Sequence, residues 1–359
     1  MLRVIRRALG AGALALLLAA AVTTAATPEG PRLAVVKTTA KSYRLELLTV
    51  GPTGDRPLRL AVRDANPRML MVFSALSWSP DGEHGVFTGI VGSRHEDDHE
   101  LLLRLFIVRA DGSGLRVIRG TSGANAPVFS PDGRTVAFNR LVDRETPTTV
   151  GGKRREEFHG ASIWTVDLLT GAQRQLTPWR DGVYYAASSF SPDGSTLLAT
   201  HEDNSLLNAP EPVALKLDGS GSRRLLEVGM SPVYSPDGSE IALIRNTAYG
   251  EGREETTDLY VIRADGTDVR RLTRTPGRSE YSPSWDPSGE RLAYARSPVA
   301  GSEYAPPGLL PNELMQINAD GTCQTTLLSA PGTAFSAPAW FSAPTWQPGP
   351  GRGAGRIEC

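Results

Sequence analysis

The sequence is poor in cysteine and in long hydrophobic runs, and neither sign of charge dominates it. Cys323 and Cys359 are the only cysteines among 359 residues, which excludes a disulfide-rich framework and a cysteine-ligated zinc module. One apolar run stands out, from Ala8 to about Val22, and three arginines precede it. This arrangement, followed by small residues, predicts a signal peptide over residues 1–26 that is removed on export.

No second apolar run in the sequence is long enough to span a bilayer, so we expect no transmembrane span after cleavage. An uncleaved membrane anchor is the alternative, and the shortness of the first run disfavours it. Residues 27–359 contain 35 basic and 39 acidic residues, a net charge of −4. Because nucleic-acid binding usually needs a clustered basic face, a nucleic-acid partner is not expected. We expect a monomer in the periplasm, in the cell envelope or outside the cell.

A repeated phrase is the strongest signal in the sequence. Four copies of an aromatic residue followed by Ser-Pro-Asp-Gly occur, with a fifth and a degraded sixth copy after them. The copies are 78–82, 129–133, 190–194, 234–238, 285–289 and 346–349. Proline sets the φ angle of the first turn position and glycine accepts the left-handed conformation, so each copy predicts a tight turn between two antiparallel strands.

The position of the turn serine, or of its equivalent, gives spacings of 51, 61, 44, 51 and 61 residues. The shortest spacing matches one four-stranded propeller blade of roughly 40 to 45 residues, so the excess is assigned to loops. A second phrase ending in Ala-Asp-Gly, as at 110–112, 264–266 and 319–321, predicts the turn between the third and fourth strands.

Counting these units predicts an all-β fold, a six-bladed β-propeller in a single domain over residues 31–349, followed by a tail over residues 350–359. Five full units run from about residue 72 to residue 328. The C-terminus adds only a first strand, at about Ala343 to Trp346. The three missing strands are expected at Pro31 to Lys37, Tyr43 to Val50 and Arg56 to Val62. Pairing of the two chain ends would complete the sixth blade and close the ring.

These repeats resemble the TolB-like β-propeller family, whose WD40-like repeat carries the same Pro-Asp-Gly turn. The resemblance covers about residues 31–349. It implies an exported propeller that binds a protein or another envelope component. The family also has a small α/β domain ahead of its propeller, and we expect that domain to be missing here. The full Tol-Pal role of the family is therefore not carried over.

The segment from His95 to His99 fits the zinc peptidase motif H-E-x-x-H, in which two histidines on a helix bind one metal. The motif falls in a predicted loop with no room for a helix, so we interpret it as solvated surface. We therefore expect no metal at His95 and His99, no other cofactor and no catalytic residue. The remaining histidines are His84, His159 and His201, and they lie in different predicted blades.

Repeated aspartates could suggest a ring of metal ligands. Turn chemistry accounts for them, because aspartate in a tight turn bonds its own backbone. These predicted structural turn residues are Asp81, Asp132, Asp193 and Asp237. The aromatic residue before each turn is expected in the core.

The two cysteines are expected to pair. Both the turn before Cys323 and the tail after Trp346 should emerge on the same face, and an exported location permits a disulfide. A Cys323–Cys359 bond would hold the closing strand in place, whereas two free thiols are the alternative.

Function is expected on the face that carries the long connections, because binding residues concentrate on loops held by a rigid scaffold. These connections are 91–100, 141–160, 201–210, 246–257 and 297–312. The candidate contact residues are Arg144, Lys153, Arg154, Arg155, Glu156, Glu157 and Tyr304. We favour a non-catalytic binding scaffold. The alternative is a propeller lyase, lactonase or hydrolase with a metal on the central axis, assembled from several blades.

Overall fold

The computed structural model of the chain consists of β-strands and the turns between them wherever it is described. It describes residues 33–38, 45–50, 58–59, 70–72, 76–91, 102–143, 148–150, 153–155, 158–203, 209–246, 256–298, 313–329, 345–346 and 356–359. Several predicted features lie outside these ranges: residues 1–26, His95, His99, Arg144, Glu156, Glu157 and Tyr304. None of the described segments forms a helix that is long and apolar enough to cross a membrane.

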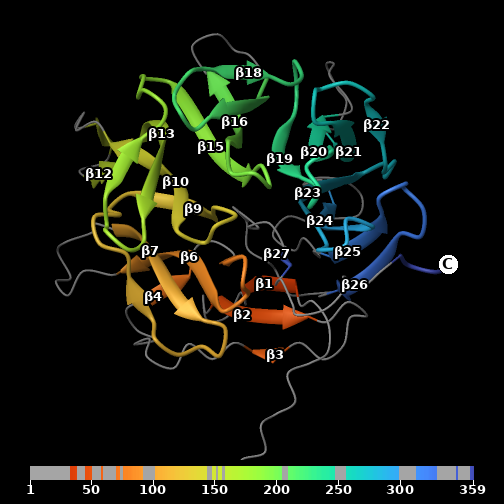
Figure 1. Cartoon of the computed structure of the whole chain (residues 1–359), viewed down its shortest axis with the longest axis horizontal. Helices are drawn as coiled ribbons and strands as arrows, with labels where there is room; N and C mark the ends of the chain where they lie inside the picture. Colours follow the sequence, from red (N-terminus) through yellow and green to blue (C-terminus); the bar gives the residue numbers. More distant parts are fainter. Residues whose placement is uncertain are drawn as a thin grey trace, which may run out of the picture.

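The sheets are arranged around a common centre and follow one another in chain order (Figure 1). The sheet formed by the two chain ends contains β27 (Thr345–Trp346), β1 (Leu33–Thr38), β2 (Leu45–Val50) and β3 (Leu58–Arg59). The next sheet contains β4 (Leu70–Val72), β5 (Ser77–Trp78), β6 (His84–Val91), β7 (Leu102–Arg109) and β8 (Arg116–Val117). Neighbouring strands in both sheets are antiparallel.

An eight-stranded sheet follows. Its first part contains β9 (Ala124–Phe129), β10 (Thr135–Asp143), β13 (Phe158–Asp167) and β14 (Gln173–Gln175). Its second part contains β15 (Val183–Phe190), β16 (Thr196–Asp203), β17 (Glu211–Lys216) and β18 (Ser222–Arg224). A single parallel bridge, between Ala161 and Tyr184, joins the two parts. A separate pair, β11 (Thr148–Val150) and β12 (Lys153–Arg155), lies between β10 and β13 in the chain.

Two four-stranded antiparallel sheets complete the arrangement. One contains β19 (Met230–Tyr234), β20 (Glu240–Asn246), β21 (Thr257–Arg263) and β22 (Arg270–Arg271). The other contains β23 (Arg278–Trp285), β24 (Arg291–Pro298), β25 (Glu313–Asn318) and β26 (Thr325–Ser329). In both sheets the strand order in space equals the order in the chain, as in a meander.

The chain ends share a sheet, with Leu33 opposite Trp346 and Ala34 opposite Thr345. Of the two predicted strands at Ala343 to Trp346 and Arg56 to Val62, the structure describes Thr345–Trp346 as β27 and Leu58–Arg59 as β3, and the other residues of both predictions lie outside the described ranges.

The hydrophobic core lies between neighbouring sheets. Phe138 of β10 packs with Val86 and Leu105 of the preceding sheet, while Ile163 of β13 packs with Phe190 and Leu197 of the following strands. Two further clusters join the later sheets in the same way. The third residue of the second strand is fully buried in five of the sheet units, and it is an alanine in three of them. These alanines are Ala137, Ala242 and Ala293, while Val86 and Leu198 stand at the same position of β6 and β16.

Each Ser-Pro-Asp-Gly turn is held by its own side chains. At the second copy the Ser130 hydroxyl donates to the Asp132 carboxylate and accepts from the backbone N–H of Thr135 at 2.9 Å. The same carboxylate accepts from the N–H of Arg134 at 3.0 Å. The fifth copy exchanges the two roles, because Asp286 accepts the closing N–H and the Ser288 hydroxyl donates to it at 2.7 Å.

The turn glycines also contact the preceding sheet. Gly238 has a φ of +74°, and a Cβ placed on it would lie 3.1 Å from Cδ of Pro192. The same arrangement joins three further pairs, Gly133 with Pro80, Gly194 with Pro131 and Gly289 with Pro236. The turn motif therefore serves two purposes, since it forms the hairpin and lets successive turns pack around the centre.

Candidate functional site

The antiparallel meander gives the molecule two different faces. The turn face carries the tight turns between first and second strands and between third and fourth strands, such as 80–82 and 264–266. The loop face carries the connections between second and third strands and from one sheet to the next. Lys153, Arg154 and Arg155, the candidate contact residues within the described ranges, lie in a connection between a second and a third strand and therefore belong to the loop face.

Part of the longest connection forms a β-hairpin. The sequence predicts a loop over 141–160, but β10 continues to Asp143, β13 begins at Phe158, and β11 pairs with β12 between them. In this pairing Val150 lies opposite Lys153 and Thr148 lies opposite Arg155. A Gly-Gly pair between two strand-forming runs is a hairpin signal, and it was available in the sequence. The candidate residues Lys153, Arg154 and Arg155 thus occupy one strand.

A network of charged side chains lies at the loop-face ends of the last two sheets. Glu313, at the start of β25, bonds Arg278 at 2.7 Å and Arg296 at 2.8 Å. In the neighbouring sheet the Asp258 carboxylate pairs with Arg271, and it accepts from the Thr273 hydroxyl at 3.3 Å. The side chain of Asp258 is only 2% exposed, so its charge is compensated inside the protein.

Glu280 of β23 lies within this network and is fully buried. Its Oε1 accepts a hydrogen bond from the Thr275 hydroxyl, whereas its Oε2 has no partner among the described residues. Burial raises the pKa of the Glu280 carboxyl to about 8, and the nearby Asp258 carboxylate adds to the increase. At neutral pH the side chain is therefore protonated, and solvent does not reach it.

A second polar cluster lies at the loop-face end of β15 to β18. The Tyr185 and His201 rings lie 4.7 Å apart, and the imidazole Nδ1 is 3.9 Å from a Glu211 oxygen. Arg224 of β18 bonds the same carboxylate at 3.2 Å. Burial raises the pKa of the Tyr185 phenol. This group offers an aromatic surface with a histidine but no nucleophile paired with a base.

The turn face holds the repeated aspartates. Hydrogen bonds from the neighbouring serine hydroxyls lower the pKa values of their carboxyls. Within the described residues, one group of three side chains could bring ligand atoms within 4.8 Å of one another for a metal, namely Asp81, Glu83 and His84. The Asp81 carboxylate is already engaged, at 2.5 Å from the Ser79 hydroxyl and 2.9 Å from the Glu83 N–H.

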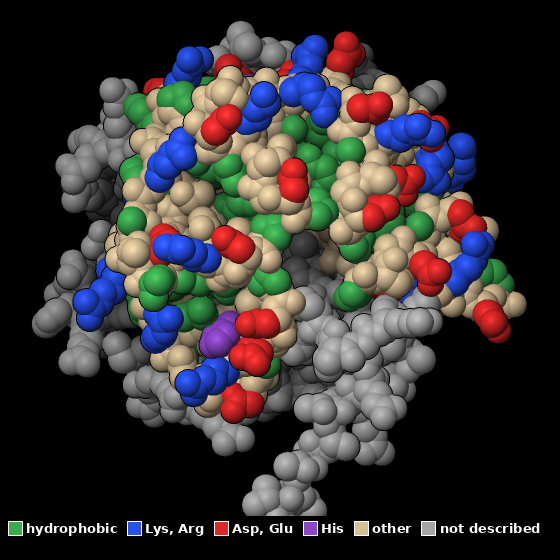
Figure 2. All heavy atoms as spheres, in the orientation of Figure 1, with side chains coloured by type: hydrophobic (Ala, Val, Ile, Leu, Met, Phe, Trp, Pro, Cys, Tyr) green, Lys and Arg blue, Asp and Glu red, His purple; other side chains and the backbone are tan. Residues whose placement is uncertain are grey.

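Two cavities on this face, of about 420 and about 360 Å³, separate turns of neighbouring sheets. Each is lined by Pro-Asp or Pro-Ser turns, so both belong to the turn architecture. On the face drawn in Figure 2, basic side chains gather toward the outer rim, and acidic side chains lie both at the rim and nearer the central hollow.

The first strands, which lie around the centre, contain β-bulges that the sequence reading missed. The register shifts between Met230 and Val233 and between Tyr281 and Ser284, and Ser231 and Ser282 have φ angles of +53° and +52°. Ala126 of β9 has the same conformation. A proline follows each of these residues and precedes the turn proline by four positions. The recurring proline marks where the bulges lie, but it does not by itself predict a positive φ angle.

Arginines of the outer strands also escaped the sequence reading. Each donates to backbone carbonyls in a turn of the next four-stranded unit, which links neighbouring units at the rim. The contacts are Arg174 with Leu217 at 3.0 Å, Arg223 with Asp265 at 2.7 Å and Ala264 at 2.9 Å, and Arg270 with Ala319 at 3.5 Å.

Cys323 and Cys359 form a disulfide, with their Cα atoms 5.3 Å apart. Cys323 follows the turn between β25 and β26, and Cys359 ends the chain. The bond therefore attaches the tail to the last full sheet, on the turn face.

Comparison with known proteins finds distant relatives. The chain is 22% identical over 313 residues to an uncharacterized protein of Agrobacterium fabrum, which covers 84% of this chain and 92% of that protein. It is 33% identical over 131 residues to the Tol-Pal system protein TolB of Anaeromyxobacter dehalogenans, a match to 35% of this chain and 27% of the relative. The chain thus spans only about a quarter of that relative. No protein-family model matches the sequence.

Solved structures show the same fold. TolB from Acinetobacter baumannii superposes with a TM-score of 0.62 at 20% identity, over 89% of this chain and 66% of that one. A protein of Agrobacterium tumefaciens described as a candidate TolB gives a TM-score of 0.53 at 19% identity, over 85% and 91% of the two chains. The same fold is indicated by the repeated turns, by the antiparallel four-stranded units around a centre and by these solved structures. The chain has a β-propeller fold similar to that of TolB.

Proposed function

We propose that this protein is an exported, six-bladed propeller that binds a protein or another component of the cell envelope and performs no catalysis. The observation that carries the proposal is the asymmetry of the two faces. Short turns, tied by their own side chains, make up the turn face, while the long connections and the β11–β12 hairpin belong to the loop face. The similarity to a protein of the Tol-Pal system supports an envelope setting.

Six blades follow if the eight-stranded sheet is divided at its single parallel bridge, Ala161 to Tyr184. Both halves are then four-stranded antiparallel units like the sheets of β1, β20 and β24. The pairing of β27 with β1 in one sheet would close the ring.

A binding role fits the chemistry at the centre. At equivalent places in β9, β15, β19 and β23 the side chains are Asn125, Ala186, Met230 and Tyr281. Tyr281 is 38% exposed. These four carry no acid or histidine that would converge on an axial metal, which is what the enzyme alternative requires.

The expected contact surface is the basic strand β12, and the partner is expected to be acidic where it meets Lys153, Arg154 and Arg155. We further propose a monomer that is processed after residue 26 and located in the periplasm, the envelope or the medium.

The test is chemical cross-linking of purified residues 27–359 to an envelope extract, followed by identification of the linked partner and binding measurements with that partner purified. A loop-face variant replaces Lys153, Arg154 and Arg155 by glutamate. A matched turn-face variant replaces the exposed Arg109, Arg116 and Lys216 by glutamate. The proposal predicts at least about a tenfold loss of affinity in the first variant only, and equal losses in both would refute the loop face as the binding face.

Metal analysis separates the binding role from the enzyme alternative. Purified protein is expected to contain less than stoichiometric metal, and His95→Ala is expected to change nothing. A stoichiometric metal that His95→Ala or His99→Ala removes would overturn the non-catalytic proposal.

A further inference from the structure

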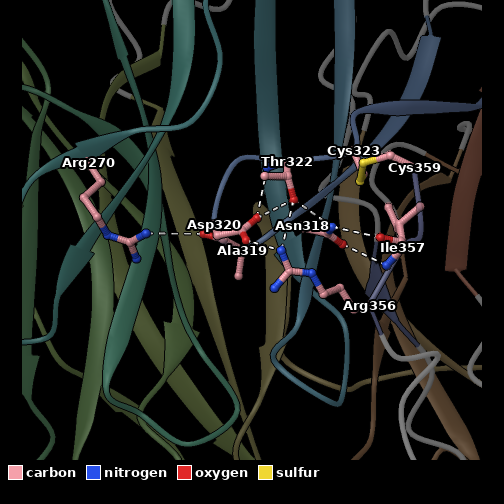
Figure 3. A network of polar contacts seen from close by, with 9 residues as sticks. All are labelled: Arg270, Asn318, Ala319, Asp320, Thr322, Cys323, Arg356, Ile357 and Cys359. Carbon is pink, nitrogen blue, oxygen red and sulfur yellow. Dashed lines mark hydrogen bonds and ion pairs between the residues drawn. A yellow bond between two sulfur atoms is a disulfide. The ribbon is translucent and has the colours of Figure 1, made fainter.

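The turn between β25 and β26 differs from the matching turns of other blades. Arg109 and Arg263 occupy the position before Ala-Asp-Gly in two earlier copies and are exposed, whereas the last copy has Asn318, which is 1% exposed. The Asn318 side-chain amide pairs with the main chain of Ile357. It donates to the Ile357 carbonyl at 3.1 Å and accepts from the Ile357 N–H at 2.9 Å (Figure 3).

This pair of bonds has the pattern of one β-bridge, with a side-chain amide in place of a second strand. Two more contacts hold the tail. Arg356 pairs with the Asp320 carboxylate and with the Thr322 hydroxyl, and Cys359 is bonded to Cys323 (Figure 3). From the other side, Arg270 of the preceding sheet donates to the Ala319 carbonyl. The turn is thus enclosed between a neighbouring sheet and the tail.

The tail follows β27 in the chain, and β27 is the strand that brings the two chain ends into one sheet. Nine residues, 347–355, connect it to β27. Within the described residues, two residue pairs align β27 with β1, compared with six pairs between β1 and β2. The disulfide, the Arg356–Asp320 ion pair and the two Asn318 hydrogen bonds add to these two pairs, so the tail attachment is a large share of the described contacts that hold the C-terminal segment.

We propose that residues 356–359 form a redox-controlled latch on the ring: Asn318 and Asp320 dock the tail and align the thiols, the Cys323–Cys359 bond locks it, and reduction lets β27 separate from β1. The proposal rests on the closed six-bladed ring proposed above. Without the disulfide, the tail retains the two hydrogen bonds between the Asn318 side chain and Ile357. It also retains the ion pair of Arg356 with Asp320, whose side chains are 60% and 44% exposed. Exposed ion pairs contribute little, so the docked state is then readily reversible.

Reduction requires a dithiol. One of its thiolates attacks a sulfur of the Cys323–Cys359 bond, and the second resolves the mixed disulfide. Two electrons and two protons pass to the cysteines, which become thiols, and the dithiol leaves as a cyclic disulfide.

Hydrogen exchange followed by mass spectrometry tests the release, using the full chain before and after treatment with dithiothreitol, with thiol titration to verify reduction. Reduction is expected to accelerate exchange of the β1 and β27 amides at least about tenfold while β20 is unchanged. Unchanged exchange in β1 would overturn the latch, and so would equal acceleration in β20, which indicates global unfolding.

The docking step has its own test. After reduction and removal of the dithiol, Asn318→Ala and Asp320→Ala are expected to re-form the disulfide at least about fivefold more slowly than the unchanged protein. Asp265→Ala is the matched control. The Asp265 carboxylate accepts a hydrogen bond from the Thr267 N–H just as the Asp320 carboxylate does from the Thr322 N–H, but Asp265 lies in the turn of another sheet, away from residues 356–359. Re-formation at the unchanged rate in Asn318→Ala would overturn the docking role. The failure of the latch can be told apart from the failure of the closed ring. If a cross-link engineered between β1 and β27 forms but reduction does not change hydrogen exchange in β1, the closed ring is supported and the latch is refuted.

Discussion

At the scale of single residues, the turn serines join the two strands of each hairpin. The Ser130 hydroxyl donates to Asp132 and accepts from the Thr135 N–H, and Ser130 is buried. Ser130→Ala leaves that N–H without its acceptor and is expected to lower the free energy of unfolding by about 1 to 2 kcal/mol. Urea denaturation measures this, with the exposed Ser122→Ala as control. Equal stability of the two variants would contradict the structural role of the turn.

Glu280 predicts a pH dependence of stability. Its pKa is raised to about 8 in the folded protein because burial disfavours the carboxylate, while an ordinary value of 4.5 applies to the unfolded chain. Between these values the folded state keeps a proton that the unfolded state has lost, so this group reduces stability as pH rises, by at most about 1.4 kcal/mol per pH unit. The loss is complete above about pH 8.

Glu280→Gln removes this dependence. We expect denaturation at pH 5 to give similar free energies of unfolding for the variant and the unchanged protein. At pH 9 the variant is expected to be more stable by a few kcal/mol. The exposed Glu227→Gln is the control. A difference that is constant across the pH range would show that Glu280 does not titrate in this window.

At the scale of elements, outer strands are linked by arginines rather than by shared sheets. Arg223 donates to two carbonyls of the next turn, so Arg223→Ala is expected to cost about 1 kcal/mol of unfolding free energy. Arg223→Lys should recover only part of this, because an ammonium group lacks the planar fork of two donors. The control is Arg116→Ala, at an exposed position of β8. Equal effects at Arg223 and Arg116 in thermal denaturation would argue against a link between sheets.

The hairpins were readable from the sequence, and the bulges were not. Proline and glycine fix the backbone at 131–133, so a local rule suffices. Ser231 and Ser282 adopt positive φ angles, which cost non-glycine residues about 1 to 2 kcal/mol. Packing of the first strands around the centre selects that conformation, so no local preference predicts it.

The candidate site was predictable only in outline. The alternation of short turns and long connections identified the loop face. The charged network did not follow from spacing, because Asp258, Glu280 and Glu313 come from different strands that tertiary packing brings together.

At the scale of the whole molecule, the disulfide is expected to stabilise the fold. It closes a sequence separation of 36 residues, for which the loss of chain entropy predicts about 3 to 4 kcal/mol. The variant with both Cys323→Ser and Cys359→Ser should lose about this amount in guanidinium denaturation. Denatured, unreduced protein should contain no free thiol, and a count of two would refute the bond.

The central claim is that the two ends of the chain meet in one blade. A variant with Ala34→Cys and Thr345→Cys places thiols on residues that face each other across β1 and β27. After oxidation, peptide mapping is expected to show a 34–345 link within one molecule, together with the native Cys323–Cys359 bond. Intact 34 and 345 thiols, or links only between molecules, would contradict the closed ring.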